Sequence, residues 1–157
     1  MQPQPPNWVD WVLRHPPFFF LLFAAFWALN GYALGKISGW AILSKRFGFK
    51  RSFYGQTWPF RSARMRFYVH YGNCLTVGAE ESGLYLAIFP IFRIGHPPLF
   101  IPWPEILVMS GEKGFIFKKR ELRLGRQESI PFRISVSLVA RLRQSAGAAW
   151  PLESAAV

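Results

Sequence analysis

The pattern of hydrophobic and polar positions changes character near residue 36. Residues 18–35, FFFLLFAAFWALNGYALG, carry no charged side chain, and Asn30 is their only strongly polar one. As a helix, this segment spans roughly 27 Å at about 1.5 Å per residue, close to the roughly 30 Å hydrocarbon core of a bilayer. Pro16 and Pro17 stand where the first turn of a helix tolerates proline. The pattern therefore predicts a transmembrane helix over residues 18–36.

Two other interpretations of this segment remain open, a cleaved signal peptide and the buried core helix of a soluble protein. Ala33-Leu34-Gly35 places small residues at the spacing of a signal-peptide cleavage site, which would make the protein a secreted one. However, the extramembrane leader of residues 1–17 is rich in proline and lacks a cationic start. Trp8, Trp11 and Trp40 flank the segment, as in an interfacial aromatic belt. These features favour a retained transmembrane helix.

The charges beside this helix predict its orientation. Residues 36–66 contain eight Lys or Arg residues and no acid. Lys and Arg near a membrane helix stay on the cytoplasmic side, so we expect a plasma (inner) membrane protein with its C-terminal domain in the cytoplasm. There, basic residues gain about 1 kcal/mol each beside an anionic leaflet. The candidate contacts with anionic lipid are Lys36, Lys45, Arg46, Lys50 and Arg51, although a solvated basic face is the simpler alternative.

Small residues form a stripe along the C-terminal part of the expected helix. Gly31, Gly35 and Gly39 repeat the small-xxx-small spacing that lets two membrane helices approach closely. We expect either self-association into a homodimer or packing on a partner helix through these three glycines. The alternative is that they merely loosen the exit of the helix from the bilayer.

The rest of the chain is predicted to be mainly β. Residues 37–63 are expected to form a short amphipathic helix (residues 37–47), lying either on the membrane or on the domain, and then a connection. The period-two alternation and Gly-rich turns predict short strands over residues 64–71, 74–77, 84–89, 106–109, 115–117, 121–124 and 130–134, with a tight turn at Gly72-Asn73. A helix follows over residues 136–146, capped by Ser135, and then a flexible tail over residues 148–157. The expected fold class is α+β, mainly β: a small bent sheet or partly open barrel of about seven strands, capped by a C-terminal helix.

The segment of residues 95–106, GHPPLFIPWPEI, holds four of the thirteen prolines. Pro98, Pro102 and Pro104 share one parity, so one edge of an extended strand here lacks backbone donors. The opposite parity directs large apolar side chains, Leu99 among them, towards one face. We therefore expect a protected edge strand. His96 belongs to the turn that enters this strand. We expect it to be part of the scaffold and not a base or a metal ligand, because no second histidine or carboxylate stands at the spacing of a metal or acid–base site.

The run of residues 83–106, GLYLAIFPIFRIGHPPLFIPWPEI, followed by hairpins and a final helix, resembles bacterial pleckstrin-homology-like domains and the related GRAM type. The chain also resembles bacterial membrane proteins of unknown function that carry an N-terminal helix followed by NCLTVG and GHPPL segments. The resemblance covers residues 64–146, within an expected domain of residues 64–147, and implies a strongly bent seven-stranded sheet capped by a C-terminal helix. Members of the family bind lipids, peptides or protein partners. No lipid-headgroup motif matches residue by residue, so the resemblance assigns no binding site.

The chain offers little chemistry for catalysis. It has no serine elbow, phosphate loop or paired carboxylates, and only eight acidic residues. Its single cysteine, Cys74, lies in an apolar run and is expected to be a small core residue. We therefore predict no enzyme, no cofactor and no metal. The net charge of +11 and the basic run of residues 118–120 keep a nucleic-acid binder as an alternative. Because topology explains the basic residues better, we expect a single-pass, membrane-anchored binding or scaffold module at the inner leaflet.

Overall fold

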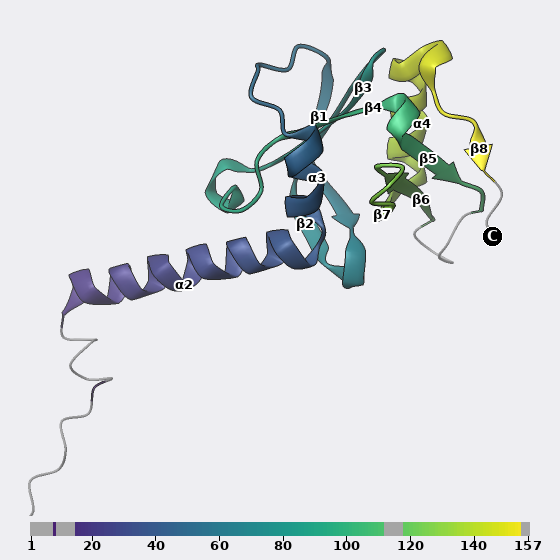
Figure 1. Cartoon of the computed structure of the whole chain (residues 1–157). Coiled ribbons are helices and arrows are strands. Elements are labelled where there is room, and N and C mark those ends of the chain that lie inside the picture. Colours follow the sequence, from purple (N-terminus) through teal and green to yellow (C-terminus); the bar gives the residue numbers. More distant parts are fainter. Residues whose placement is uncertain (1–7, 9–14, 112–117, 155–157) are drawn as a thin grey trace, which may run out of the picture.

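The computed structural model describes residue 8, residues 15–111 and residues 118–154. It shows an N-terminal apolar helix, a sheet of eight strands curled into a half-barrel, and a C-terminal helix (Figure 1). The helices are α2 (Pro16–Ile37), α3 (Trp40–Phe47) and α4 (Val136–Ala146). The strands are β1 (Gln56–Arg64), β2 (His70–Glu80), β3 (Gly83–Ile88), β4 (Leu99–Pro102), β5 (Ile106–Met109), β6 (Lys119–Leu124), β7 (Ile130–Ser135) and β8 (Glu153–Ser154). The strand expected over residues 115–117 and most of the leader lie outside the described residues.

Helix α2 projects from the half-barrel as a long rod (Figure 1). Its bounds confirm the helix predicted over residues 18–36, with two prolines in its first turn. It ends where Gly39 adopts a φ of 86°, a left-handed conformation that favours glycine, and a Cβ there would lie 2.8 Å from Ile130 Cδ1. The chain therefore turns sharply from α2 into α3.

Helix α3 packs on the body, which decides between the two placements left open by the sequence. Trp40 and Leu43 are fully buried, and Phe47 is nearly so. The indole Nε1 of Trp40 donates to the carbonyl oxygen of Pro97 at 2.8 Å. The expectation that Trp40 belongs to an interfacial aromatic belt is therefore wrong, because this residue anchors α3 in the core.

The strand order of the sheet is β4-β3-β2-β1-β7-β6-β5-β8. Two antiparallel meanders, β1–β4 and β5–β7, meet where β1 pairs with β7 at Arg64 and Arg133. The alternating burial along β4 and β7 is what a strand with one core-facing side predicts. The core between the two meanders includes Leu75, Leu86, Ile101 and Phe132, all fully buried.

The first two strands differ from the sequence prediction. Strand β1 takes up residues 56–64, most of which were expected to be a connection, and β2 runs through Gly72-Asn73, where a turn was expected. The chain instead reverses at a 3₁₀ turn, Arg66–Tyr68. Asn73 has a φ of 48° at a register shift against β1, where Ser62 is hydrogen-bonded to its side chain. A positive φ suits asparagine in a bulge as well as in a turn, so the dipeptide alone does not separate the two.

The proline segment forms the edge strand β4, as predicted. Leu99 and Ile101 are fully buried and pair with β3. The outer side of β4 is partly covered, because the backbone N–H of Phe49 donates to the carbonyl oxygen of Pro98 at 2.8 Å. This contact and the missing proline donors limit pairing with another sheet edge.

The C-terminal part begins as predicted and then differs. Ser135 caps α4 by accepting a hydrogen bond from the N–H of Leu138, and α4 packs its apolar face on the sheet. The expected flexible tail instead folds back onto the body as far as residue 154. Trp150 packs on Trp103 with ring centroids 5.3 Å apart, and β8 pairs in parallel with β5.

Candidate functional site

The loop of residues 89–96, between β3 and β4, lies along the C-terminal half of α2. The indole Nε1 of Trp27 donates to the carbonyl oxygen of Ile91 at 3.2 Å, and its ring lies 5.3 Å from that of Phe92. Further along α2, a Cβ on Gly35 would lie only 2.5 Å from the carbonyl oxygen of Gly95. Contacts between α2 and this loop therefore extend from Trp27 to Gly35. We call this interface between the helix and the body the joint.

The predicted glycine stripe lies in this joint. Gly31 and Gly35 pack against the loop, where a Cβ on Gly31 would lie 3.1 Å from the carbonyl oxygen of Ile94. Gly39 instead faces Ile130 in the body. The close approach that the spacing predicts is thus found within one chain, between α2 and the chain's own loop and strand β7. Self-association of the helix stays a prediction.

A buried polar network holds the joint from inside. The hydroxyl of Tyr71 in β2 lies 2.8 Å from Ser38 Oγ, just past α2, and 2.9 Å from His96 Nε2 in the loop. His96 Nδ1 lies 3.0 Å from the carbonyl oxygen of Ile94, which can only accept, so Nδ1 carries a proton. Nε2 of a neutral imidazole is then an acceptor, and the single hydroxyl proton of Tyr71 serves either this contact or the one to Ser38 Oγ. One hydroxyl thereby links the end of α2, the sheet and the loop.

Burial favours the neutral form of these groups. It lowers the pKa of His96, against an opposing effect of the hydrogen bond to Ile94, and raises the pKa of Tyr71 to about 12. Both groups are therefore neutral at pH 7, as expected of polar groups that pair within a core. The expectation that His96 is part of the scaffold agrees with this geometry.

A cavity of about 390 Å³ lies beside the network, between α2 and the body. Trp27, Gly31 and Leu34 of α2 form one wall, and residues 69–74 at the start of β2 form another. Ile88 and the loop complete the lining. Cys74 lines this cavity and is half-buried rather than fully buried, and burial raises the pKa of its thiol.

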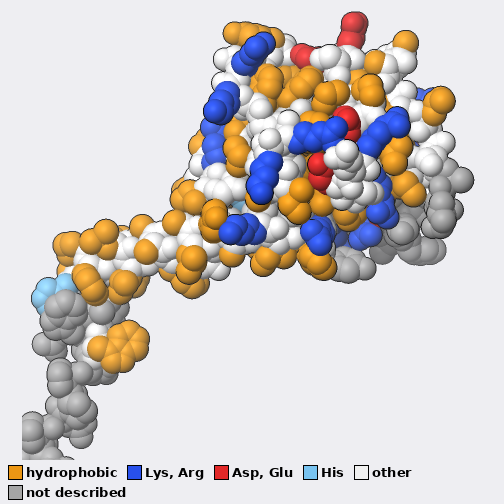
Figure 2. Space-filling model, in the orientation of Figure 1, with side chains coloured by type: hydrophobic (Ala, Val, Ile, Leu, Met, Phe, Trp, Pro, Cys, Tyr) orange, Lys and Arg blue, Asp and Glu red, His pale blue; other side chains and the backbone are white. Residues whose placement is uncertain are grey.

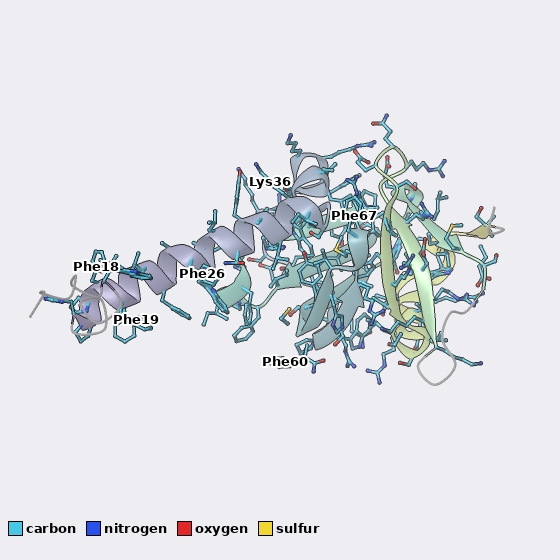
Figure 3. All side chains as sticks on the ribbon, turned by 90° about the horizontal axis from the view of Figure 1, so that it is seen from below. Phe18, Phe19, Phe26, Lys36, Phe60 and Phe67 are labelled. Atoms are coloured by element: carbon cyan, nitrogen blue, oxygen red, sulfur yellow. The ribbon has the colours of Figure 1, made fainter. Side chains whose placement is uncertain are left out.

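Next to the cavity, the body exposes a group of apolar side chains that we call the apolar rim: Phe60, Phe89, Ile91, Phe92 and Ile94. Between 41% and 64% of each side chain is accessible. The rings of Phe60 and Phe89 lie 6.1 Å apart, and Phe60 has a φ of 54° at a register shift in β1. Such a conformation costs a bulky residue about 1–3 kcal/mol. Figure 3 shows Phe60 at the edge of the body on the side of α2.

The five candidate lipid-contact residues do not share one environment. Lys36, at the end of α2, lies over the ring of Tyr32, and Lys45, Lys50 and Arg51 are also exposed. Arg46 instead forms ion pairs with two carboxylates of the body, Glu105 at 2.8 Å and Glu128 at 3.6 Å. These pairs tie α3 to the body. Figure 2 shows Lys and Arg side chains over the face of the body seen there, including the flank next to α2.

Other chemistry expected or excluded from the sequence can be located in the fold. Among residues 15–111 and 118–154, no group of three or more His, Cys, Asp or Glu side chains could hold a metal ion. In the basic run of residues 118–120, Arg120 pairs with Glu153 of β8. Sequence reasoning missed the joint and the apolar rim. The available signal for the rim was the run FPIFRI (residues 89–94), which is mostly apolar although it extends beyond the end of the preceding strand.

No family model, curated protein or solved structure matches the chain.

Proposed function

We propose that the chain is a single-pass membrane protein with a non-catalytic binding body on the cytoplasmic face of the plasma membrane. The observation that carries this proposal is the exposure of α2: only 6% of its most apolar 18-residue window is buried. Large apolar side chains, Phe18, Phe19 and Phe26 among them, point outward around the rod (Figure 3). A helix of 22 residues spans roughly 33 Å, enough to cross the hydrocarbon core of a bilayer.

The joint supports a retained helix over a cleaved signal peptide. Cleavage after Gly35 would remove Trp27, Gly31 and Gly35 from the loop against which they pack. It would also remove one wall of the cavity and expose more of the apolar rim. Exposed apolar patches of this kind are unfavourable in a secreted monomer.

The charge distribution supports the orientation and an anionic lipid surface as partner. No Asp or Glu occurs between Asp10 and Glu80, whereas Lys and Arg are frequent from residue 36 onward. Four of the five candidate contacts are exposed without a carboxylate partner among the described residues. We infer that these basic residues hold the body against an anionic inner leaflet. The curled sheet with its C-terminal helix is compatible with a pleckstrin-homology-like body, which remains part of this proposal.

The proposal is tested on the full-length chain. We expect it to stay in the membrane fraction after a carbonate wash, with an intact N-terminus by mass spectrometry. A reporter that is active only in the cytoplasm should be active when it is fused to the C-terminus. Recovery from the soluble fraction, or a chain that begins at Lys36, would contradict the proposal.

Lipid contact is tested with two variants that remove equal charge. Lys50→Gln with Arg51→Gln changes the exposed segment between α3 and β1, whereas Arg141→Gln with Arg143→Gln changes α4, on a part of the body away from α2 (Figure 1). We expect the first pair to lower the ratio of anionic to zwitterionic lipid that copurifies, and the second to leave it unchanged. Equal ratios in both variants would contradict a specific role for the basic flank.

A further inference from the structure

The cavity between α2 and the body has the size of a ligand site. Its volume of about 390 Å³ lies within the roughly 300–1,000 Å³ typical of small-molecule pockets. Its walls come from three separate parts of the chain: α2, the start of β2 and the loop between β3 and β4. Trp27, at one end, is held in place by its hydrogen bond to Ile91.

The lining suits an apolar ligand. Most of the wall is formed by side chains such as Leu34, Val69 and Ile88. The polar groups in the wall are largely satisfied within the protein: the amide of Asn30 donates to a carbonyl oxygen of its own helix at 2.7 Å, and His96 is hydrogen-bonded through both ring nitrogens. A strongly polar ligand would lose its hydration there and gain few new hydrogen bonds. An aliphatic chain has no hydrogen-bonded hydration shell to lose.

The position of the cavity points to the source of such a chain. Phe92 and Ile94 line the cavity and also belong to the exposed apolar rim, so the cavity borders the surface that lies beside α2. With α2 in a bilayer, that surface is in contact with lipid acyl chains. An acyl chain can then enter between the helix and the loop without crossing water.

The charges around the cavity indicate which class of lipid supplies the acyl chain. The segments that form the walls contain no acid, because Asp and Glu are absent from residues 11–79 and 82–104. Lys36 lies at the end of α2 and Arg93 lies in the loop, both exposed. A negative headgroup above the cavity would therefore meet positive charge and no carboxylate from these segments.

We propose that this cavity binds one acyl chain of an anionic lipid from the leaflet at the C-terminal end of α2. This inference rests on the proposed function, since it needs α2 in the bilayer. The lipid chain fills the space between helix and body and so becomes part of the joint. The headgroup stays at the membrane surface beside Lys36, and the long side chain of Arg93 extends towards it from the loop.

The test uses the full-length chain in lipid nanodiscs that contain phosphatidylglycerol with a photoreactive diazirine on one acyl chain. Trypsin separates the two regions of interest, because cleavage after Arg14, Lys36, Arg66 and Arg93 gives peptides of residues 15–36 and 67–93. Fragment ions then locate the adducts. We expect adducts on the lipid-facing residues of α2 and, in addition, on residues 69–74 at the cavity wall.

Cavity-blocking variants show whether the second adduct arises in the cavity. Cys74→Phe places a ring in the cavity and should reduce the adducts on residues 69–74 at least fivefold, whereas Cys74→Ser keeps the volume and should retain them. If Cys74→Phe fails to fold, Gly72→Leu is a second blocker. Gly72 is exposed, and the nearest atom to a Cβ there, the Cε1 of His70, lies 3.7 Å away.

Each outcome decides one part of the proposal. Adducts on α2 with none on residues 69–74 would overturn the cavity site and leave the membrane anchor intact, whereas no adducts on either peptide would overturn the anchor itself. Adducts on residues 69–74 that persist in the blocked variants would show contact outside the cavity and overturn the site. Equal labelling by a phosphatidylcholine probe would overturn the preference for an anionic lipid.

Discussion

Replacing Tyr71 with phenylalanine tests whether the buried hydroxyl holds the joint together. The substitution keeps the ring, which packs against Trp40 with centroids 5.8 Å apart, and removes only the oxygen. It deletes the hydrogen bonds to Ser38 at 2.8 Å and to His96 at 2.9 Å, and it leaves Nε2 of a buried imidazole without this partner. The expected loss is therefore larger than for an exposed hydroxyl.

The magnitude follows from the two contacts. Each hydrogen bond contributes about 0.5–1.5 kcal/mol net, so Tyr71→Phe should lower the free energy of unfolding by about 1–3 kcal/mol. For a chain of this length, a loss of about 2 kcal/mol corresponds to a decrease of roughly 4–8 °C in the unfolding midpoint. The measurement is thermal unfolding of the full-length protein in detergent, followed by tryptophan fluorescence.

Tyr85→Phe is the matched control. Tyr85 is half-buried and stacks on Phe53 at 4.5 Å, but within the described residues its hydroxyl makes no hydrogen bond. We expect its free energy of unfolding to stay within about 0.5 kcal/mol of that of the wild-type protein, as for most substitutions away from a specific contact. If Tyr71→Phe shifts the midpoint no more than Tyr85→Phe, the network does not stabilise the joint and the reasoning fails.

Three further predictions concern the joint, its pH dependence and its charges. Gly35→Ala should lower the unfolding midpoint, because overpacking costs about 1–3 kcal/mol and the gain in helix propensity offsets only about 1 kcal/mol. Gly72→Ala, where the added methyl group meets open space, should leave the midpoint unchanged, and equal midpoints for the two variants would contradict the close approach. Because burial lowers the pKa of His96 from the 6.5 of a free histidine, the contribution of this residue to the free energy of unfolding should be fully present above pH 6.5 and should decrease as the pH falls below that value. Midpoints at pH 7.5 and 5.5 should therefore differ more in the wild-type protein than in His96→Gln, and an unchanged difference would count against this role. Arg46→Ala should lower the free energy of unfolding by at most about 1 kcal/mol, whereas Lys45→Ala should lower only the amount of anionic lipid that copurifies; the reverse pattern would exchange their assigned roles.

The parts of the fold that could be predicted depend on local rules. An uninterrupted apolar run defines α2, the parity of prolines defines the edge strand β4, and Ser135 marks the start of α4. Each of these signals lies within a few residues of the element that it predicts. By contrast, Gly72-Asn73 fits a turn or a bulge equally well, and only the pairing of β2 with β1 selects the bulge.

The candidate site depends on distant contacts, which explains why the sequence did not reveal it. Gly35 and Gly95 are 60 positions apart, yet their backbones are in close contact. Ser38, Tyr71 and His96 are common residue types with no shared spacing, and they form a network only because the loop folds back along α2. The small-xxx-small pattern did predict a close approach to a helix, but a pattern in one segment does not identify its partner.

The joint has a geometric consequence for any membrane that α2 crosses. The loop contacts α2 at Trp27, which lies ten residues before Ile37, so it reaches back roughly 15 Å along the helix axis at about 1.5 Å per residue. A helix that crosses the bilayer close to the membrane normal would therefore carry the apolar rim below the surface, next to the acyl chains. We expect the network around Tyr71 to hold the body in this position. The exposure of apolar side chains such as Ile91, unfavourable for a soluble body, then becomes favourable, because these side chains face lipid instead of water.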